Sequence, residues 1–197
     1  TKIVLNGAGA AGTAIARLLV LAGARNIIGF DSSGVINKKS ASNSDMRKWF
    51  IENCNPEQFE GNLSQAMNGA DIFIGVSAPN LLSEADIQSM AKGSIVFALA
   101  NPDPEIDPVL ARKHAAVVAT GRSDQPNQIN NVLAFPGIFR GLLDAGASKI
   151  TDELLVACAE AIASCVGESQ LNASFIVPSV FDTNVVKSVA DAVKRFT

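Results

Sequence analysis

The stretch "LNGAGAAGTA" (residues 5–14) places three glycines directly after a short apolar run. These glycines are Gly7, Gly9 and Gly12. The apolar residues that follow recur at intervals of three and four, which is typical of the buried face of a helix. We therefore predict a strand over Lys2–Leu5, a glycine turn, and a helix over Ala10–Ala22.

The rest of the chain continues this alternation of strands and helices. Further strand candidates are Asn26–Phe30, Ile72–Val76, Ser94–Leu99 and Ala116–Ala119. Helical patterns cover Asp45–Asn53, Leu63–Met67, Glu84–Met90, Val132–Leu143, Thr151–Val166 and Asn184–Phe196. Apolar strands alternating with helices predict an α/β fold, a Rossmann-like doubly wound parallel sheet. We expect one domain over residues 1–197, with the C-terminal helices flanking the sheet.

Composition narrows the class of protein. The net charge of −3 over 197 residues provides no basic footprint for nucleic acid. No apolar run approaches the roughly 18 residues of a membrane span, and we expect no secretory leader, because the first residues show no charged segment followed by an apolar one. The three cysteines form no C-x-x-C pair, which favours free thiols in a reducing compartment and hence a cytoplasmic location.

The glycine turn matches a dinucleotide-binding fingerprint in its context. Asp31 follows Gly7 by 24 residues, at the end of the second predicted strand. In this interpretation Gly7 permits the tight turn, Gly9 lets the pyrophosphate approach, and Gly12 lets the helix pack closely. Asp31 would accept hydrogen bonds from the ribose hydroxyls. The alternative is a glycine-rich turn with an incidental acidic residue.

Asp31 also favours NAD over NADP, because a carboxylate repels a 2′-phosphate. No arginine follows it in residues 32–34. Lys38 and Lys39 could reach back toward this position or could form a solvated basic pair.

The remaining predicted strand ends are rich in amides and hydroxyls, which bind ligands but cannot take a proton from an alcohol. His114 is the single histidine, and the chain has no tyrosine. We expect His114 to be a surface or capping residue rather than a base. The acidic run "NPDPEID" (101–107) reads as a rigid, solvated loop, with a metal cluster as the alternative. Arg122 could clamp an anion or form a surface pair.

Several longer segments carry a family resemblance. They are "GAGAAG" (7–12), "GADIFIGVSAPNLL" (69–82), "FALANPDPEI" (97–106), "ATGRSDQPNQINNVLAFPGIFRG" (119–141) and "IVPSVFD" (176–182). Together they resemble the NAD-binding domain of malic enzymes. The resemblance covers essentially the whole chain.

The resemblance implies oxidative decarboxylation of L-malate to pyruvate and CO2, with NAD or NADP and a Mg or Mn ion. It implies cofactor contacts at Gly7, Gly9, Ala10, Ala11, Gly12, Asp31, Ser77, Asn101 and Asn131. Asn101 and Asn131 would also contact malate. The family's catalytic tyrosine, its lysine and its metal-binding acids match nothing here. They are expected in a preceding N-terminal domain, so this chain alone should be inactive, and family members are usually at least dimeric.

Two other hypotheses remain open. One is the cofactor domain of a different dehydrogenase, of an amino-acid or methylene-folate type. The other is a non-catalytic dinucleotide-binding or redox-sensing module.

Overall fold

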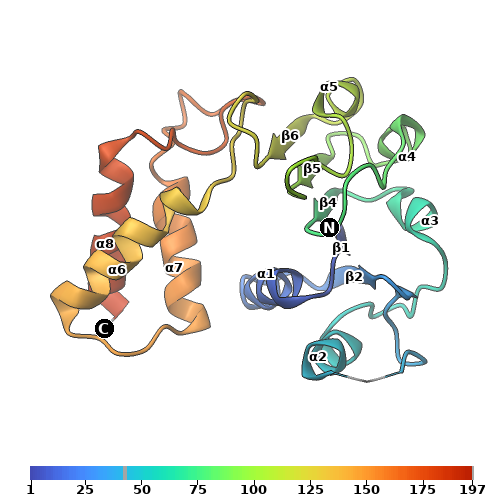
Figure 1. Ribbon diagram of the computed structural model, residues 1–197, viewed down its shortest axis with the longest axis horizontal. Coiled ribbons are helices and arrows are strands. Elements are labelled where there is room, and N and C mark those ends of the chain that lie inside the picture. The colour runs from blue at the N-terminus through green and yellow to red at the C-terminus, as the bar shows by residue number, and fades with distance from the viewer. Residues whose placement is uncertain (42–43, 197) are drawn as a thin grey trace. The chain divides into compact units, whose positions relative to one another are not determined.

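The structure is a computed structural model that describes residues 1–41 and 44–196. The chain divides into two compact units, Thr1–Gln125 (unit 1) and Pro126–Thr197 (unit 2). Unit 1 contains the sheet, and unit 2 is built mainly from helices (Figure 1).

The sheet of unit 1 has six strands in the order β3-β2-β1-β4-β5-β6. Their bounds are β1 Lys2–Asn6, β2 Asn26–Asp31, β3 Gly34–Val35, β4 Ile72–Gly75, β5 Ile95–Ala98 and β6 Val117–Thr120. All neighbours pair in parallel except β2 and β3, which are antiparallel. The predicted α/β sheet is therefore confirmed. The two-residue strand β3 was not predicted, because it is too short to leave a pattern in the sequence.

The described residues of unit 1 form five helices. They are α1 Ala10–Leu21, α2 Asp45–Asn53, α3 Leu63–Met67, α4 Glu84–Gln88 and α5 Pro108–Ala111. One sheet face, with Ile3 and Ile27, packs against α1 and α2 through a core that includes the fully buried Phe50. The other face, with Val4 and Phe73, packs against α3, α4 and α5. Helices therefore cover both faces (Figure 1), which is the doubly wound arrangement that the sequence predicts.

Unit 2 contains a 3₁₀ turn, η1 (Asn131–Leu133), and three helices. These helices are α6 Phe135–Ala145, α7 Asp152–Ala163 and α8 Thr183–Phe196. Glycines at 137 and 141 let α6 approach α8 closely, since a Cβ at Gly137 would lie 2.5 Å from Cβ of Val189. Helical structure in the C-terminal segment is confirmed, and this segment forms a compact unit of its own.

The helix predicted over Val132–Leu143 is interrupted. The structure ends η1 at Leu133 and starts α6 at Phe135, with Pro136 in its first turn. Proline lacks an N–H and its φ suits the start of a helix, so Pro136 favours a new helix start over a continuous helix. At the other end, α6 continues to Ala145 and stops at Gly146, whose φ is +64°.

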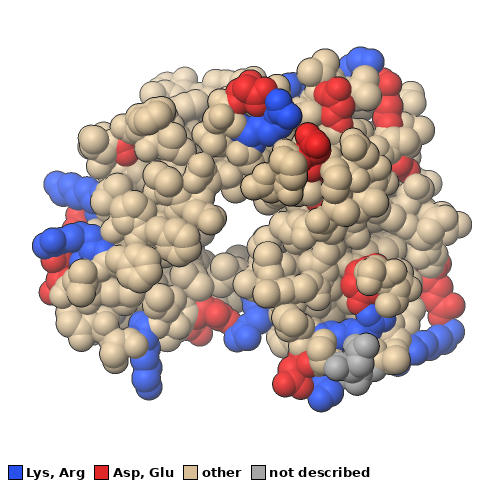
Figure 2. Space-filling model, in the orientation of Figure 1, with Lys and Arg blue, Asp and Glu red and all other residues tan. Residues whose placement is uncertain are grey.

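Neither a membrane-spanning helix among the described residues nor a concentration of one charge on the drawn face is seen. Among residues 1–41 and 44–196, no helix has both the length and the apolar character needed to cross a bilayer. On the face drawn in Figure 2, basic and acidic side chains are interspersed rather than gathered by sign.

Candidate functional site

The glycine turn is held against the second strand. The N–H groups of Gly7 and Ala8 both donate to the carbonyl of Phe30, at 2.9 and 3.0 Å. Gly7 has a φ of +118°, and a Cβ there would lie 2.7 Å from the carbonyl oxygen of Val76. Gly12 is more restricted still, because its Cβ would lie 2.0 Å from the carbonyl oxygen of Gly7. Both positions therefore require glycine.

Helix α1 begins at this turn with its backbone donors uncapped. Gly9 is its N-cap, no side chain caps the helix, and no acidic residue lies in the first turn. Ala10 and Ala11 are exposed. In contrast, Ser44, Asn62, Ser83 and Thr151 cap α2, α3, α4 and α7 with their side chains. Free N–H groups and the positive end of the helix dipole make the start of α1 suited to a phosphate group.

A cavity of about 460 Å³ lies beside the turn. Its lining residues are Asn6, Gly7, Phe30, Asp31, Ser32, Gly34, Asn62, Leu63, Ser77, Ala78 and Leu81. The structure thus brings together Gly7, Asp31 and Ser77, three residues that the sequence predicts for the site. Ser77 is also tied to the first strand, since its Oγ accepts a hydrogen bond from Nδ2 of Asn6 at 2.9 Å.

Asp31 lies at the end of β2 and has two partners. Its Oδ1 accepts a hydrogen bond from the Ser33 N–H at 2.8 Å, and its Oδ2 forms an ion pair with Nη1 of Arg47 on α2. Arg47 was not predicted for this site, because it lies 16 positions beyond Asp31 and not in the segment 32–34 that directly follows it. Among the described residues, Nε of Arg47 is buried and has no hydrogen-bond partner. Lys39, in contrast, pairs with Glu60 at the surface.

Asn101 lies in a second cavity of unit 1, of about 280 Å³. The residues lining it follow β5 and β6: Ala100, Asn101, Pro102, Gly121, Arg122, Ser123 and Asp124. Arg122 donates to both carboxylate oxygens of Asp124, at 2.8 and 2.6 Å, and this pairing raises the pKa of the arginine. In the structure Arg122 therefore forms a surface ion pair, which was the alternative to clamping an anion.

Asn131 belongs to unit 2. It is the first residue of η1, and its side chain is exposed. The preceding residue, Asn130, caps the turn by accepting a hydrogen bond from the Val132 N–H at 3.0 Å.

The prediction of a solvated loop over residues 101–107 is only partly correct. Asp103 and Asp107 are exposed, but Glu105 is completely buried. Its carboxyl group accepts hydrogen bonds from two backbone N–H groups and fills the space beside Gly75, so burial leaves neither oxygen unpaired. Among the described residues, no group of three His, Cys, Asp or Glu side chains is arranged so that it could hold a metal ion.

His114 and the neighbouring Lys113 lie in surface pairs with Glu84. Nε2 of His114 lies 3.0 Å from Oε1 of Glu84, and Nζ of Lys113 lies 3.3 Å from the same oxygen. The hydrogen bond from His114 is the main cause of a lowered pKa at Glu84. Pairing with Glu84 matches the surface role expected for His114.

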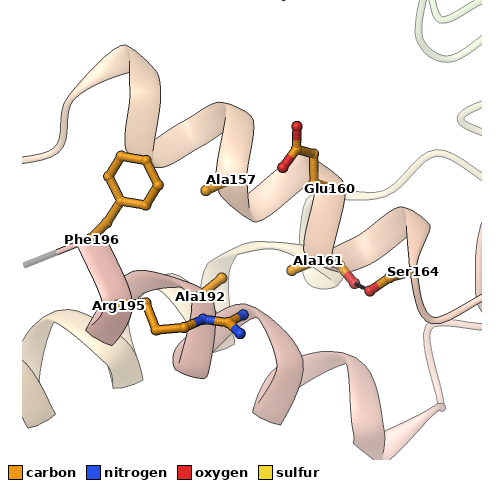
Figure 3. A pocket seen from close by; sticks show the side chains of 7 residues that line it. All are labelled: Ala157, Glu160, Ala161, Ser164, Ala192, Arg195 and Phe196. Carbon is orange, nitrogen blue, oxygen red and sulfur yellow. Dashed lines mark hydrogen bonds between the residues drawn. The ribbon is translucent and has the colours of Figure 1, made fainter.

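Unit 2 has a cavity of its own, of about 440 Å³, between α7 and α8 (Figure 3). Its lining residues are Ala157, Glu160, Ala161, Ser164, Ala192, Arg195 and Phe196. None of them is a residue that the sequence predicts for the site.

The fold and the turn together define an α/β domain of the dinucleotide-binding class, with a glycine turn between β1 and an uncapped α1. The chain matches the family described as "Malic enzyme, NAD binding domain" over residues 1–197. It therefore belongs to the family of malic enzyme NAD-binding domains, as the resemblance in the sequence indicates.

Individual relatives agree with this assignment. The chain is 52% identical over 192 residues to the NAD-dependent malic enzyme of Geobacillus stearothermophilus, covering 98% of this chain and 40% of the relative. It is 39% identical over 212 residues to the NADP-dependent malic enzyme of Salmonella typhimurium. This match covers 98% of this chain and 28% of the relative. The crystal structure of the NAD-dependent malic enzyme of Thermotoga maritima superimposes with a TM-score of 0.92 at 43% sequence identity. The superposition covers 98% of this chain and 51% of the Thermotoga chain. The chain thus spans about half or less of these relatives.

Proposed function

We propose that this chain is the cofactor-binding part of a malic enzyme that converts L-malate to pyruvate and CO2 while reducing NAD or NADP. The observation that carries the proposal is the uncapped α1 N-terminus beside a cavity lined by Gly7, Asp31 and Ser77. Membership of the malic enzyme family supports malate as the substrate.

The residues present fit a dinucleotide. The N–H groups at the start of α1, around Gly9, Ala10 and Ala11, would hold the pyrophosphate, and Gly12 keeps the helix close to the turn. Asp31 would bind the adenosine ribose. Relatives of this chain include both NAD- and NADP-dependent enzymes, so the family alone does not select the cofactor. The carboxylate of Asp31 favours NAD, and Arg47 beside it makes NADP a second cofactor.

We assign to this chain the positioning of the cofactor and malate for the reaction. A bound NAD or NADP would supply the hydride acceptor for the oxidation of malate at C2. Ser77 and Asn101 follow β4 and β5, at the carboxyl edge of the sheet where ligands bind in this fold. With Asn131, they would orient the cofactor and malate by hydrogen bonds and contribute to the rate by holding the reacting atoms in place.

The proton-transfer groups and the divalent Mg or Mn ion are assigned to the rest of a longer protein. The chain contains no tyrosine, and its described residues offer no cluster of metal ligands. It covers 40% of the length of its Geobacillus relative. We therefore propose that residues 1–197 are one lobe, C-terminal to a catalytic domain, in a cytoplasmic enzyme that is at least a homodimer.

The test uses the full-length protein with L-malate, NAD and Mg²⁺. We expect absorbance at 340 nm to rise together with pyruvate and CO2, and the rise to stop when malate or the metal is omitted. An enzyme that binds NAD but oxidises an amino acid or a folate instead would support the other dehydrogenase hypothesis. Binding of NAD with no turnover of any of these substrates would support a sensing module.

A further inference from the structure

Glu105 is a carboxyl group inside unit 1 to which the proposed reaction gives no role. The residue is 0% exposed and lies in the loop that follows β5. Within the described residues it forms no ion pair, and both of its oxygens accept hydrogen bonds from the backbone. Burying a carboxyl group is costly unless such bonds compensate for lost water, so its partners indicate why it is there.

The partners of Glu105 lie in two different loops. Oε1 accepts from the Ser77 N–H, after β4, and Oε2 accepts from the Ala100 N–H, after β5, both at 3.1 Å. The backbone continues the connection, since the Leu82 N–H donates to the carbonyl of Glu105 at 3.0 Å. Gly75 leaves the necessary space, because a Cβ there would lie 2.3 Å from the Glu105 carboxyl carbon. One side chain therefore joins the ends of two parallel strands.

A third strand end joins the same network. Nδ2 of Asn6, the last residue of β1, donates to Oγ of Ser77 at 2.9 Å. We call Asn6, Ser77 and Glu105 the brace. The first proposed cofactor contact after each of β1, β4 and β5 is a member of the brace or the neighbour of a residue that belongs to it or bonds to it. Gly7 follows Asn6, Ser77 is a member, and Asn101 follows Ala100.

We propose that Glu105 is a positioning residue that sets the spacing between the loop of Ser77 and the loop of Asn101. This inference rests on the proposed function, because it gives Glu105 its effect through a bound dinucleotide. The adenosine half of the cofactor would be held by the glycine turn and Asp31, and the hydrogen bonds described for Glu105 reach neither of them. The brace therefore acts on the nicotinamide half and on hydride transfer, where small displacements are costly.

The test compares Glu105→Gln with wild type in the full-length enzyme. Glutamine keeps the shape but has one acceptor oxygen instead of two, so one of the two loops loses its bond. Asp71→Asn is the matched control. Asp71 also accepts a backbone hydrogen bond between neighbouring strands, from the Lys2 N–H at 2.6 Å, but at the opposite edge of the sheet.

Binding of ADP-ribose and of NAD is measured by calorimetric titration, and kcat is measured with malate. For Glu105→Gln we expect ADP-ribose affinity to stay within about twofold and kcat to fall about 10- to 100-fold, with weaker NAD binding. Asp71→Asn should match wild type in all three quantities. An unchanged kcat for Glu105→Gln would overturn the inference, as would an equal loss of ADP-ribose and NAD affinity.

The wild-type measurements separate this inference from the proposed function. A wild-type enzyme that binds neither NAD nor ADP-ribose removes both proposals, whereas normal wild-type binding with an unaffected Glu105→Gln variant removes only the role of Glu105. If Glu105→Gln does not fold, Glu105→Asp replaces it, since aspartate retains two acceptor oxygens on a shorter side chain. A folded Glu105→Asp enzyme with wild-type kcat would also overturn the inference.

Discussion

Arg47 on α2 forms an ion pair with Asp31 at the end of β2, although 16 residues separate them in the chain. Both side chains are mostly buried, at 13% and 22% exposed, and Asp31 lines the cavity beside the glycine turn. Arginine can bind a phosphate group with two parallel hydrogen bonds. The site near the end of β2, which was expected to exclude a 2′-phosphate, therefore has both the carboxylate of Asp31, which repels a phosphate, and the guanidinium of Arg47, which attracts it.

Arg47→Met is expected to weaken NADP binding about tenfold and NAD binding much less, because the cation would interact with the 2′-phosphate alone. Dissociation constants for both cofactors, measured by titration of the full-length enzyme, test this. Lys39→Met is the control, since Lys39 pairs with Glu60 at the surface. Equal losses for NAD and NADP in Arg47→Met would contradict the role of Arg47.

Asp31→Ala should have the opposite selectivity. It removes the carboxylate that would bind the ribose hydroxyls of NAD and frees Arg47 from its ion pair. NAD affinity should therefore fall more than NADP affinity in the same titrations. If both affinities changed by the same factor, Asp31 would not be at the ribose.

The two glycines Gly12 and Gly9 should separate folding from binding. A Cβ at Gly12 would lie 2.0 Å from the Gly7 carbonyl oxygen, so Gly12→Ala should lower the free energy of unfolding by about 1–3 kcal/mol. A Cβ at Gly9 would meet nothing within 4 Å, and its φ of −87° suits alanine.

Gly9→Ala should therefore keep its stability within about 0.5 kcal/mol of wild type. Its NAD affinity should still fall about tenfold, because the added methyl group would stand where the pyrophosphate approaches the backbone. Thermal unfolding and cofactor titration of both variants are the measurements. Wild-type NAD affinity in Gly9→Ala would place the pyrophosphate elsewhere.

Asn131→Ala in the full-length enzyme should lower kcat/KM for malate about 10-fold or more, through the loss of a positioning hydrogen bond. Its unfolding temperature should barely change, because Asn131 is exposed and the turn is capped by Asn130. Steady-state kinetics and thermal unfolding provide the two readouts. Unaltered kinetics would remove Asn131 from the site.

Cys54 should be inert in the native protein. Burial raises the pKa of its thiol from 9.0 to about 12, so at pH 8 alkylation should be about 100-fold slower, or more, than in the unfolded chain. The half-buried Cys165 should react faster and serves as the internal comparison. Rapid alkylation of native Cys54 would show that its surroundings open readily.

The same thiol makes a pH-dependent contribution to stability. Its pKa is higher in the folded state than in the unfolded state, so the folded state holds the proton more tightly. This contribution is fully present below pH 9 and is lost as the pH rises toward about 12. Denaturant unfolding of wild type and Cys54→Ala across this range should show the difference.

The local features of this protein follow from its amino-acid sequence alone. The glycine turn, the alternation of strands with helices, and the bounds of α2 and α3 were all predicted correctly. Each depends on residues that are close in the chain, where periodicity and backbone preferences act. The motifs that indicated the malic enzyme family are also contiguous.

Contacts between residues that are distant in the chain depend on the three-dimensional packing. Arg47 reaches Asp31 because α2 packs against the sheet, and no pattern near Asp31 encodes that contact. Glu105 was expected in a solvated loop, yet it is buried because Gly75 leaves space and two strand ends supply donors. In both cases the partners come from separate strands and helices. Their proximity results from the packing of the sheet and its helices, which the spacing of residues along the chain does not record.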